Sequence, residues 1–333
     1  MRKATIRDIC KETGLSMGTV SKYLNGGVLK ESNRKKIDAA IRKLDYHVDE
    51  YARGLITNRT KTVGVIITKM NNLFYTRIIS DIDTQLYKRG YSTIIKESSG
   101  DLKKEIDSIE WFISRRVDAL VIVPTGRTQE DYAILDNVGI PIVFLDSYVE
   151  GVRCESVVVD NEEITYKAID GIIKNGHTKI SVILDMNSPY TANARLAGLK
   201  RAFRDNRLSE DTLRVYPIYE SLDSSYEVTR QIVKETDSTV LFSANYISTL
   251  GAVYCLNEFN VKVPEDISVL GFDDIMITNL YRPKLTIINQ PTEQIAERTV
   301  ERLMELFAHE DEERRVNVLN CELVHGETIA KLN

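Results

Sequence analysis

Acidic and basic side chains follow apolar runs in the central and C-terminal parts of the sequence. Asp146 ends the run IVFLD and Asp273 ends the run VLGFD. A carboxylate can accept hydrogen bonds from two neighbouring hydroxyl groups at once, which suits a sugar. Arg195, in NARLAG, opens a predicted helix and offers a fork of donors to a hydroxyl, carboxylate or phosphate. With Phe74 as an apolar face, these residues predict a site for a polar small molecule.

The segments that would position these residues alternate between strand and helix from Lys61 onward. Continuous short apolar runs are typical of buried strands, and apolar residues three or four positions apart are typical of helices. The predicted strands are residues 62–68, 91–98, 118–124, 140–146, 179–185, 239–245 and 266–273. This alternation implies parallel sheets with helices on both faces.

The expected site lies between two lobes. The part of the chain after Thr60 is too long for one such core, so two lobes are expected. Ligands of open α/β sheets bind beyond the C-terminal ends of the strands. In a two-lobed body, the cleft between the lobes is therefore where the strand-end residues should meet.

Short motifs of common catalytic and metal sites are absent from the sequence. It has no P-loop, GxGxxG, GxSxG or HExxH pattern, and its four histidines are scattered. The four cysteines form no CxxC pair, and no apolar run is long enough to span a membrane. The N-terminus lacks a signal-peptide pattern. We therefore expect a cytoplasmic protein that is not an enzyme and that binds no metal or cofactor.

Basic residues concentrate at the N-terminus. Residues 1–60 contain 13 Lys and Arg and 7 Asp and Glu, a net charge of +6. The rest of the chain contains 31 and 42, a net charge of −11. A basic head on an acidic body suggests that only the head meets a polyanion. Considered alone, the charge is also compatible with a chance fluctuation of surface composition.

Three short helices are predicted in the basic head. A capping-box pattern at Thr5 predicts a helix over residues 6–12. Ser16 is a suitable cap for a second helix over residues 17–24, and apolar periodicity predicts a third over residues 32–44. Two short helices joined by a tight turn and closed by a third describe a helix-turn-helix. A small helical bundle without a nucleic-acid role is the alternative.

The segment ATIRDICKETGLSMGTVSKYLNGG resembles the N-terminal headpiece of the lactose-repressor (LacI/GalR) family. The matching positions are Thr5, Ile6, Asp8, Gly14, Ser16, Thr19, Val20, Ser21, Leu24 and Asn25. The resemblance implies that the second helix meets the major groove of DNA. It implies phosphate contacts for Thr5, Ser16, Thr19, Ser21 and Asn25, and base contacts for Met17, Gly18 and Lys22.

The base-contacting positions carry unusual residue types. Gly18 has no side chain to contact a base, Met17 offers only apolar contacts, and Lys22 can donate to guanine acceptors. Relatives usually have arginine at the position of Lys22, so a bidentate fork is lost. We therefore expect this helix to make few direct contacts with the bases. Sequence specificity should depend more on the next segment of the chain and on DNA shape.

The segment HVDEYARGLITNRTKT resembles the hinge of the same family. The resemblance implies a short helix in which Ala52, Arg53 and Leu55 contact DNA, Leu55 as a wedge in the minor groove. A helix this short is marginal alone in water, so it should order only against DNA and a second subunit. A buried linker leucine is the alternative for Leu55.

Segments of the body stand in the family's order and spacing, among them RTKTVGVII, RRVDALVIVP, GIPIVFLD, NGHTKISVIL and VPEDISVLGFDDI. The resemblance implies the α/β fold of the type I periplasmic-binding-protein class, with two parallel doubly wound sheets. The expected domains are a headpiece at residues 1–48, a hinge at 49–60 and an effector-binding and dimerisation body at 61–333. Within the body, lobe 1 should hold about residues 61–160 and 291–325, and lobe 2 about residues 161–290.

The resemblance also extends the candidate effector site. The implied effector contacts are Phe74, Asp146, Arg195, Asn245, Asp273 and Gln290. For each polar residue, a helix cap or a hydrogen bond between the lobes is the alternative. Leu222 replaces an aromatic residue that stacks on the ligand in the family, and Tyr190 and Tyr219 are the candidates to take its place.

The family resemblance implies a sequence-specific transcriptional regulator, expected to be a repressor, that binds palindromic operator DNA as a homodimer. A small molecule in the cleft would change operator affinity allosterically, in a direction that the sequence leaves open. Sugars are the commonest effectors, and purines and phosphoproteins serve some relatives. The absence of a heptad-bearing tail favours a dimer over a tetramer. An exported sugar-binding protein would explain the body but not the head, and an enzyme has no supporting motif.

Overall fold

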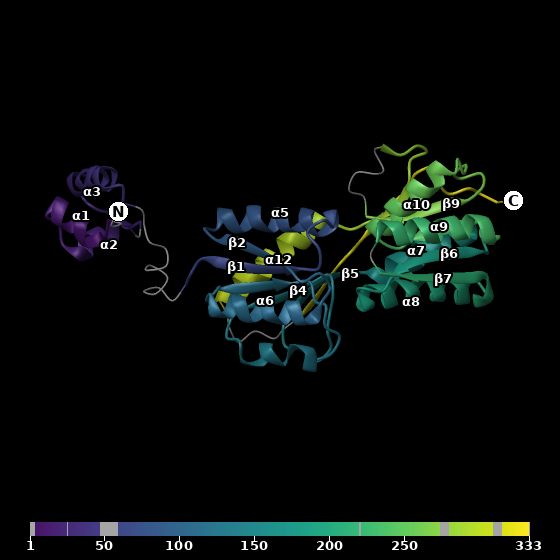
Figure 1. Ribbon diagram of the computed structural model, residues 1–333, viewed down its shortest axis with the longest axis horizontal. Coiled ribbons are helices and arrows are strands. Elements are labelled where there is room, and N and C mark those ends of the chain that lie inside the picture. Colours follow the sequence, from purple (N-terminus) through teal and green to yellow (C-terminus); the bar gives the residue numbers. More distant parts are fainter. Residues whose placement is uncertain are drawn as a thin grey trace. The chain divides into compact units, whose positions relative to one another are not determined.

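The computed structural model describes residues 4–24, 26–46, 59–219, 221–273, 280–308 and 315–332. The chain divides into two compact units, Met1–Thr60 and Lys61–Asn333. The described part of the first unit is helical, and the second unit contains two sheets (Figure 1). Within the described residues, no helix combines the length and the apolar character needed to cross a bilayer.

The first unit contains the helices α1 (Ile6–Thr13), α2 (Met17–Leu24) and α3 (Glu31–Leu44). Its core is formed by Ile9, Val20, Ile37 and Ala40, one or two from each helix. Partly buried apolar residues three or four positions from them along each helix pack against this core, namely Ile6, Tyr23, Leu24, Ile41 and Leu44. Burying these faces against one another fixes the three-helix packing. Gly14 ends α1 in the left-handed conformation, with φ 68°. The three helices predicted from the sequence are confirmed, with ends that differ by a residue.

The first lobe of the body is built on a six-stranded sheet with the order β11-β5-β4-β3-β1-β2. Its elements are β1 (Thr62–Ile67), α5 (Leu73–Lys88), β2 (Ser92–Glu97), α6 (Leu102–Ser114), β3 (Ala119–Ile122), η1 (Glu130–Asn137), β4 (Ile142–Leu145), β5 (Glu155–Val159), α12 (Thr292–Ala308) and β11 (Val316–Leu319). All five strand pairs are parallel. Helices α5 and α12 cover one face, and α6 with η1 covers the other.

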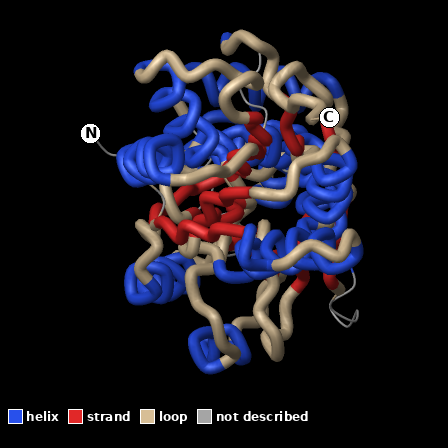
Figure 2. The backbone as a smooth tube through the Cα atoms, turned by 90° about the vertical axis from the view of Figure 1, so that its right-hand side faces the viewer, coloured by secondary structure: helices blue, strands red, loops and turns tan. Residues whose placement is uncertain are grey.

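The second lobe has a six-stranded sheet with the order β12-β10-β9-β8-β6-β7. Its elements are α7 (Asn161–Lys174), β6 (Ile180–Asp185), α8 (Pro189–Asp205), η2 (Glu210–Thr212), β7 (Leu213–Ile218), α9 (Leu222–Glu235), β8 (Val240–Ser243), α10 (Tyr246–Glu258), β9 (Ser268–Phe272), β10 (Thr286–Asn289) and β12 (Glu322–Val324). Helices α7 and α8 pack on one face, and α9 and α10 pack on the other. Figure 2 shows helices on both sides of strands in the body.

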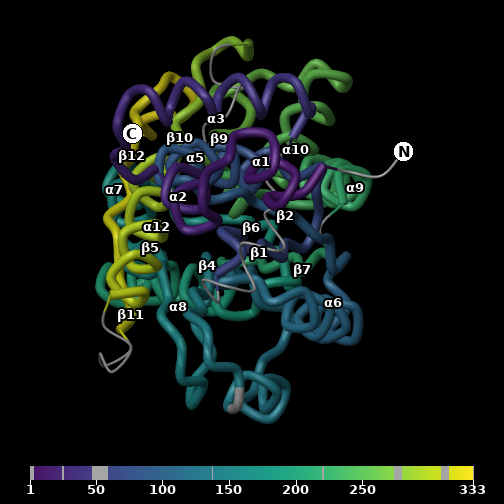
Figure 3. Tube along the Cα trace, turned by 90° about the vertical axis from the view of Figure 1, so that its left-hand side faces the viewer, coloured from purple at the N-terminus to yellow at the C-terminus, as the bar shows by residue number. Residues whose placement is uncertain are grey.

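The chain crosses between the lobes three times, between β5 and α7, between β10 and α12, and between β11 and β12. Figure 3 shows α12 and β11, late in the sequence, beside β5 of the first lobe. The expectation that residues 291–325 all belong to lobe 1 is wrong, because β12 pairs antiparallel with β10 of lobe 2. Pairing there covers a strand edge of β10 that would otherwise be open. The sheets are therefore mostly, not wholly, parallel.

Candidate functional site

A cavity lies within the body where the two lobes face one another. It is lined from lobe 1 by residues after β1, β3 and β4 and at the start of α5, and from lobe 2 by residues of α8, α10 and the ends of β6, β9 and β10. The structure brings together all six predicted effector contacts on its walls, namely Phe74, Asp146, Arg195, Asn245, Asp273 and Gln290. Except for Arg195, these positions are C-terminal strand ends and helix starts, which is where a doubly wound fold binds ligands.

Two buried aspartates occupy equivalent places in the two lobes. Asp146 follows β4 with φ 60°, and Asp273 follows β9 with φ 67°. The left-handed region is open to aspartate and asparagine more readily than to most other side chains. The Tyr75 hydroxyl donates to Asp146 Oδ2 at 2.9 Å, and Gln290 Nε2 donates to Asp273 Oδ1 at 2.7 Å. Within the part of the chain that the structure describes, each carboxylate is thus fixed by one neutral side-chain donor of its own lobe, and Asp273 also accepts from the backbone of Tyr246.

Burial dominates the electrostatics of both carboxylates. Loss of water raises the pKa of Asp146 to about 6, although Arg195 and the Tyr75 hydroxyl favour the charged form. Burial also raises the pKa of Asp273 to about 6; the charge of Asp146 adds to this rise, and Arg195 and Gln290 oppose it. The cavity therefore holds two carboxylates that are costly to ionise before a ligand binds.

Arg195 is buried and is held by neutral acceptors. Its Nε donates to Asn161 Oδ1 at 2.7 Å, and its Nη1 donates to the carbonyl oxygen of Ala244. The guanidinium carbon lies 3.6 Å from the centroid of the Phe272 ring, a cation–π contact. The expectation that Arg195 opens its helix is wrong, because α8 begins at Pro189 and places Arg195 in the second turn. Its long side chain reaches the cavity from there.

Asn245 and Gln290 each have a structural contact and face the cavity. Asn245 caps α10, since its Oδ1 accepts from Ser248 N at 2.7 Å, and its Nδ2 donates to Asp185 Oδ2 at 2.9 Å. Gln290 is 3% exposed, and its Oε1 has no hydrogen-bond partner among the described residues. A buried acceptor without a donor is uncommon, so the Gln290 carbonyl indicates a place for a ligand or a water.

The cavity residues that the sequence analysis did not predict include Tyr75, Asp185 and Tyr246, whose polar groups can contact a ligand. Asp185 had the same signal as Asp146 and Asp273, since it ends the predicted strand of residues 179–185. Of the two candidates to replace an aromatic stacking residue, Tyr219 is 70% exposed and does not line the cavity. Tyr190 instead packs edge-on against Tyr148 of the other lobe, with ring centroids 6.4 Å apart.

The second predicted site is the outer face of α2. Met17 is 48% exposed, and Gly18 and Lys22 are also exposed. A Cβ atom added at Gly18 would meet nothing within 4 Å, so this position faces open space. Val20, on the opposite face, is fully buried in the core of the unit. The helix thus has an exposed face opposite its buried one, which is the arrangement of a recognition helix in a helix-turn-helix.

Two of the predicted phosphate-contacting residues, Thr5 and Ser16, also stand at the N-terminal ends of helices. The Asp8 carboxylate accepts from Thr5 N at 2.8 Å and from Thr5 Oγ1 at 2.7 Å. Ser16 Oγ accepts from Thr19 N at 3.3 Å and lies 2.9 Å from Thr19 Oγ1. A hydroxyl that donates one hydrogen bond can still accept another. The structure places Ser21, half-buried, on the same helix. The predicted contacts Asn25, Ala52, Arg53 and Leu55 lie outside the described residues.

Comparison with known proteins follows this division of the chain. The family model of bacterial regulatory proteins, lacI family, matches residues 5–49, and that of a periplasmic binding protein-like domain matches residues 169–329. The HTH-type transcriptional repressor PurR of Vibrio atlanticus (strain LGP32) is 30% identical over 333 residues, 99% of this chain and 100% of the relative. PurR of Aliivibrio fischeri (strain MJ11) is 31% identical over 326 residues, 96% of this chain and 97% of the relative.

Solved structures share the same fold. The lac repressor dimer bound to operator and the anti-inducer ONPF has a TM-score of 0.88 at 23% identity and covers 99% of this chain and 100% of its own. A LacI family transcriptional regulator from Enterococcus faecium with bound ribose has a TM-score of 0.75 at 24% identity and covers 82% and 100%. The fold and the cavity define a helix-turn-helix unit joined to a two-lobed body of periplasmic-binding-protein type. With full-length relatives at this identity, the chain belongs to the lacI family of bacterial regulatory proteins.

Proposed function

We propose that this protein is a transcriptional repressor that binds operator DNA through α2 and whose DNA affinity depends on a small molecule in the interlobe cavity. The observation that carries the proposal is that the two units of the chain have different candidate binding sites. One presents an exposed helix face on a basic headpiece, and the other contains a cavity on which buried polar side chains converge. The relatives named as HTH-type transcriptional repressors support the repressor role.

The effector is proposed to be a sugar or a sugar derivative. Two carboxylates, a guanidinium group and an amide converge on the cavity, and all of them form hydrogen bonds with hydroxyl groups. A fold relative was solved with bound ribose, which is compatible with this class. Ligand binding would favour one arrangement of the lobes, and operator affinity changes only if the two arrangements bind the ligand differently.

A homodimer is proposed as the binding form, since two headpieces are needed for a palindromic operator. Exposed apolar side chains on both lobes of the body support a self-association surface. On lobe 1 they include Tyr87, Ile94 and Ile95, and on lobe 2 they include Leu222 and Tyr254. The edge strand β2 exposes two adjacent isoleucines, Ile94 and Ile95. Exposure of this apolar surface to water is unfavourable in a monomer, and a second subunit would cover it.

Selection of DNA from a random-sequence pool by the full-length chain tests the proposal. We expect enrichment of a palindromic site, and an affinity for it that falls steeply with salt because many contacts are to phosphate. Lys22→Ala should lower affinity for the selected site about tenfold by removing a donor to base acceptors. Lys35→Ala is the matched control, because Lys35 is an exposed lysine of α3 paired with Glu31.

Two outcomes would contradict the DNA-binding role. One is a pool from which no sequence is enriched, and the other is an affinity that does not change with salt. If Lys22→Ala and Lys35→Ala weaken binding equally, α2 does not contact the bases and the recognition-helix assignment is wrong.

A further inference from the structure

The cavity has an excess of negative charge. Among the described residues that line it, Asp146, Asp185 and Asp273 are acidic and Arg195 is the basic residue. Three carboxylates against one guanidinium group give the cavity a formal charge of −2 when all are ionised. An anion entering this space would meet like charges in surroundings with little water, where Coulomb repulsion is strong.

Arg195 is already engaged within the protein, with two of its five N–H donors used. Its hydrogen bonds to Asn161 and Ala244 and its contact with Phe272 fix the guanidinium group within lobe 2. Its charge already favours the ionised forms of Asp146 and Asp273, one in each lobe. The positive charge is therefore balanced by the protein before any ligand binds.

Acceptors on the cavity wall need donors from the ligand. Among the described residues, Asp146 and Asp273 each receive one side-chain hydrogen bond, from Tyr75 and Gln290, and Asp273 also accepts from the backbone of Tyr246. A carboxylate can accept about four hydrogen bonds. The Oε1 atom of Gln290 is buried and has no partner among the described residues. Leaving a buried acceptor unpaired costs free energy, which a ligand donor would recover.

We propose that the cavity selects a ligand that is rich in hydrogen-bond donors and has no negative charge, so that phosphorylated sugars and nucleotides are excluded. Uncharged polyhydroxy compounds and amines of similar size are the ligands that fit. The inference rests on the proposed function, because it concerns the effector of the same site, and it narrows the sugar derivatives that the site would accept.

Matched pairs of compounds test the charge selectivity with the full-length protein. The pairs are ribose and ribose 5-phosphate, glucose and glucose 6-phosphate, and adenosine and AMP, with glucosamine as a cationic partner of glucose. Thermal stabilisation identifies binders, and calorimetry gives their Kd. In each pair that binds, we expect the phosphorylated member to bind at least about tenfold more weakly. A phosphorylated member that binds as tightly as its partner overturns the proposal, and so does a panel without an uncharged or cationic binder.

Isosteric variants locate the cause of the selectivity. Asp146→Asn and Asp273→Asn remove one negative charge each, and asparagine tolerates the left-handed backbone of both positions. The ratio of Kd values within a pair should shift toward the phosphorylated member by about tenfold in each variant. Asp107→Asn, an exposed position on α6, makes the same change in net charge and should leave the ratio unchanged. Equal shifts in all three variants would mean that net charge, not the cavity, excludes anions.

Operator binding separates this proposal from the function on which it rests. If a phosphorylated compound binds and changes the affinity for the selected DNA, the effector-controlled repressor stands and the charge selectivity is wrong. If uncharged compounds bind selectively but leave DNA affinity unchanged, the selectivity stands and effector control is wrong.

Discussion

Lobe 1 and lobe 2 place an aspartate after the same strand of the same strand order, yet they secure it differently. Asp146 depends on the Tyr75 hydroxyl from α5, whereas Asp273 depends on Gln290, at the end of the neighbouring strand β10. Lobe 2 also supplies Arg195, so most polar groups of the cavity belong to one lobe. Lobe 1 adds the rings of Phe74 and Tyr75 and the apolar residues after β3.

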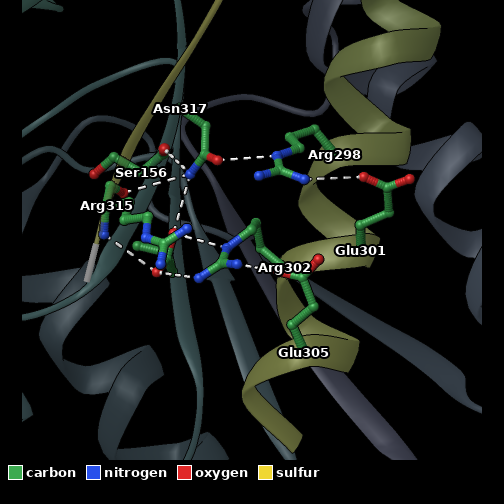
Figure 4. A network of polar contacts seen from close by, with 8 residues as sticks. Ser156, Arg298, Glu301, Arg302, Glu305, Arg315 and Asn317 are labelled. Atoms are coloured by element: carbon green, nitrogen blue, oxygen red, sulfur yellow. Dashed lines mark hydrogen bonds and ion pairs between the residues drawn. The ribbon is translucent and has the colours of Figure 1, made fainter. Parts of the chain in front are cut away.

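The two lobes also differ in how they hold the returning C-terminal segments. In lobe 1, Arg302 of α12 forms a buried bidentate ion pair with Glu155 of β5, with hydrogen bonds of 2.8 and 3.1 Å. Figure 4 shows Arg302 on α12 with Arg315 and Asn317 close to it. In lobe 2, neutral groups fix the tail: Thr328 Oγ1 donates to Val269 O, and Ala330 O accepts from His177. The two sheets have the same strand order, but their C-terminal segments are held by a charged pair in lobe 1 and by neutral hydrogen bonds in lobe 2.

Arg302→Met is expected to have the largest effect on stability. It leaves the carboxylate of Glu155, 0% exposed, without its countercharge, which costs about 3–5 kcal/mol. Arg298→Met, one turn away on α12 and partly exposed, is the control and should cost at most about 1 kcal/mol. Thermal unfolding of the full chain measures both.

The double variant Glu155→Leu with Arg302→Met should recover most of the lost stability, because apolar pairs often replace buried ion pairs without loss. A double variant as unstable as Arg302→Met alone would show that lobe 1 depends on the network of Asn317 and Arg315 around the pair, not on its charges.

Asp146→Asn and Asp273→Asn should each stabilise the protein at pH 7, by about 1–3 kcal/mol. A carboxyl with a pKa of about 6 in the fold and near 4 in the unfolded chain binds its proton more tightly when folded. It therefore lowers stability as pH rises from about 4 to 6. The gain in the free energy of unfolding of each variant should shrink toward pH 4. The gain of the double variant should be smaller than the sum of the two single gains, because the two charges repel each other in the unmodified protein.

Melting temperatures between pH 4 and pH 8 check this prediction. An advantage that is the same at every pH would mean that the substitutions act through packing. A gain for one lobe alone would show that the symmetric positions are not electrostatically equivalent.

Protonation of His177, a residue of lobe 2, should have the smallest effect on stability among these predictions. Its Nε2 faces Ala330 O and its Nδ1 faces Thr239 Oγ1, both at 2.9 Å, so the neutral ring donates through Nε2. Burial lowers the pKa of His177, so the unfolded chain takes up a proton that the fold resists. Stability should therefore fall as pH falls below about 6.5, the unfolded pKa. His177→Gln should lose this dependence, and His325→Gln, on an exposed side chain, should keep it.

Much of the fold was predictable from local patterns. The capping box at Thr5 and the helical periodicity of Ile9, Val20 and Ile37 predicted the headpiece helices. Strand-end positions predicted Asp146 and Asp273 as cavity residues, because the fold class brings strand ends together. The antiparallel β12 was not predictable, since its three residues have no local signal that separates lobe 2 from lobe 1.

The sequence by itself determined the headpiece helices, seven strands of the body and the residue types at their ends, because burial patterns and caps act over a few residues. The strands β5, β7 and β10 were not among those predicted. Only the tertiary structure decided which buried polar side chains are paired with one another. Glu155 meets Arg302 from 147 positions away, and His177 meets Ala330 from 153 positions away. Asn161 has no local signal for a role in the cavity, and only the fold places its side chain against Arg195. Such pairs form because burial of polar groups requires compensation, and topology alone determines which group is near enough to supply it.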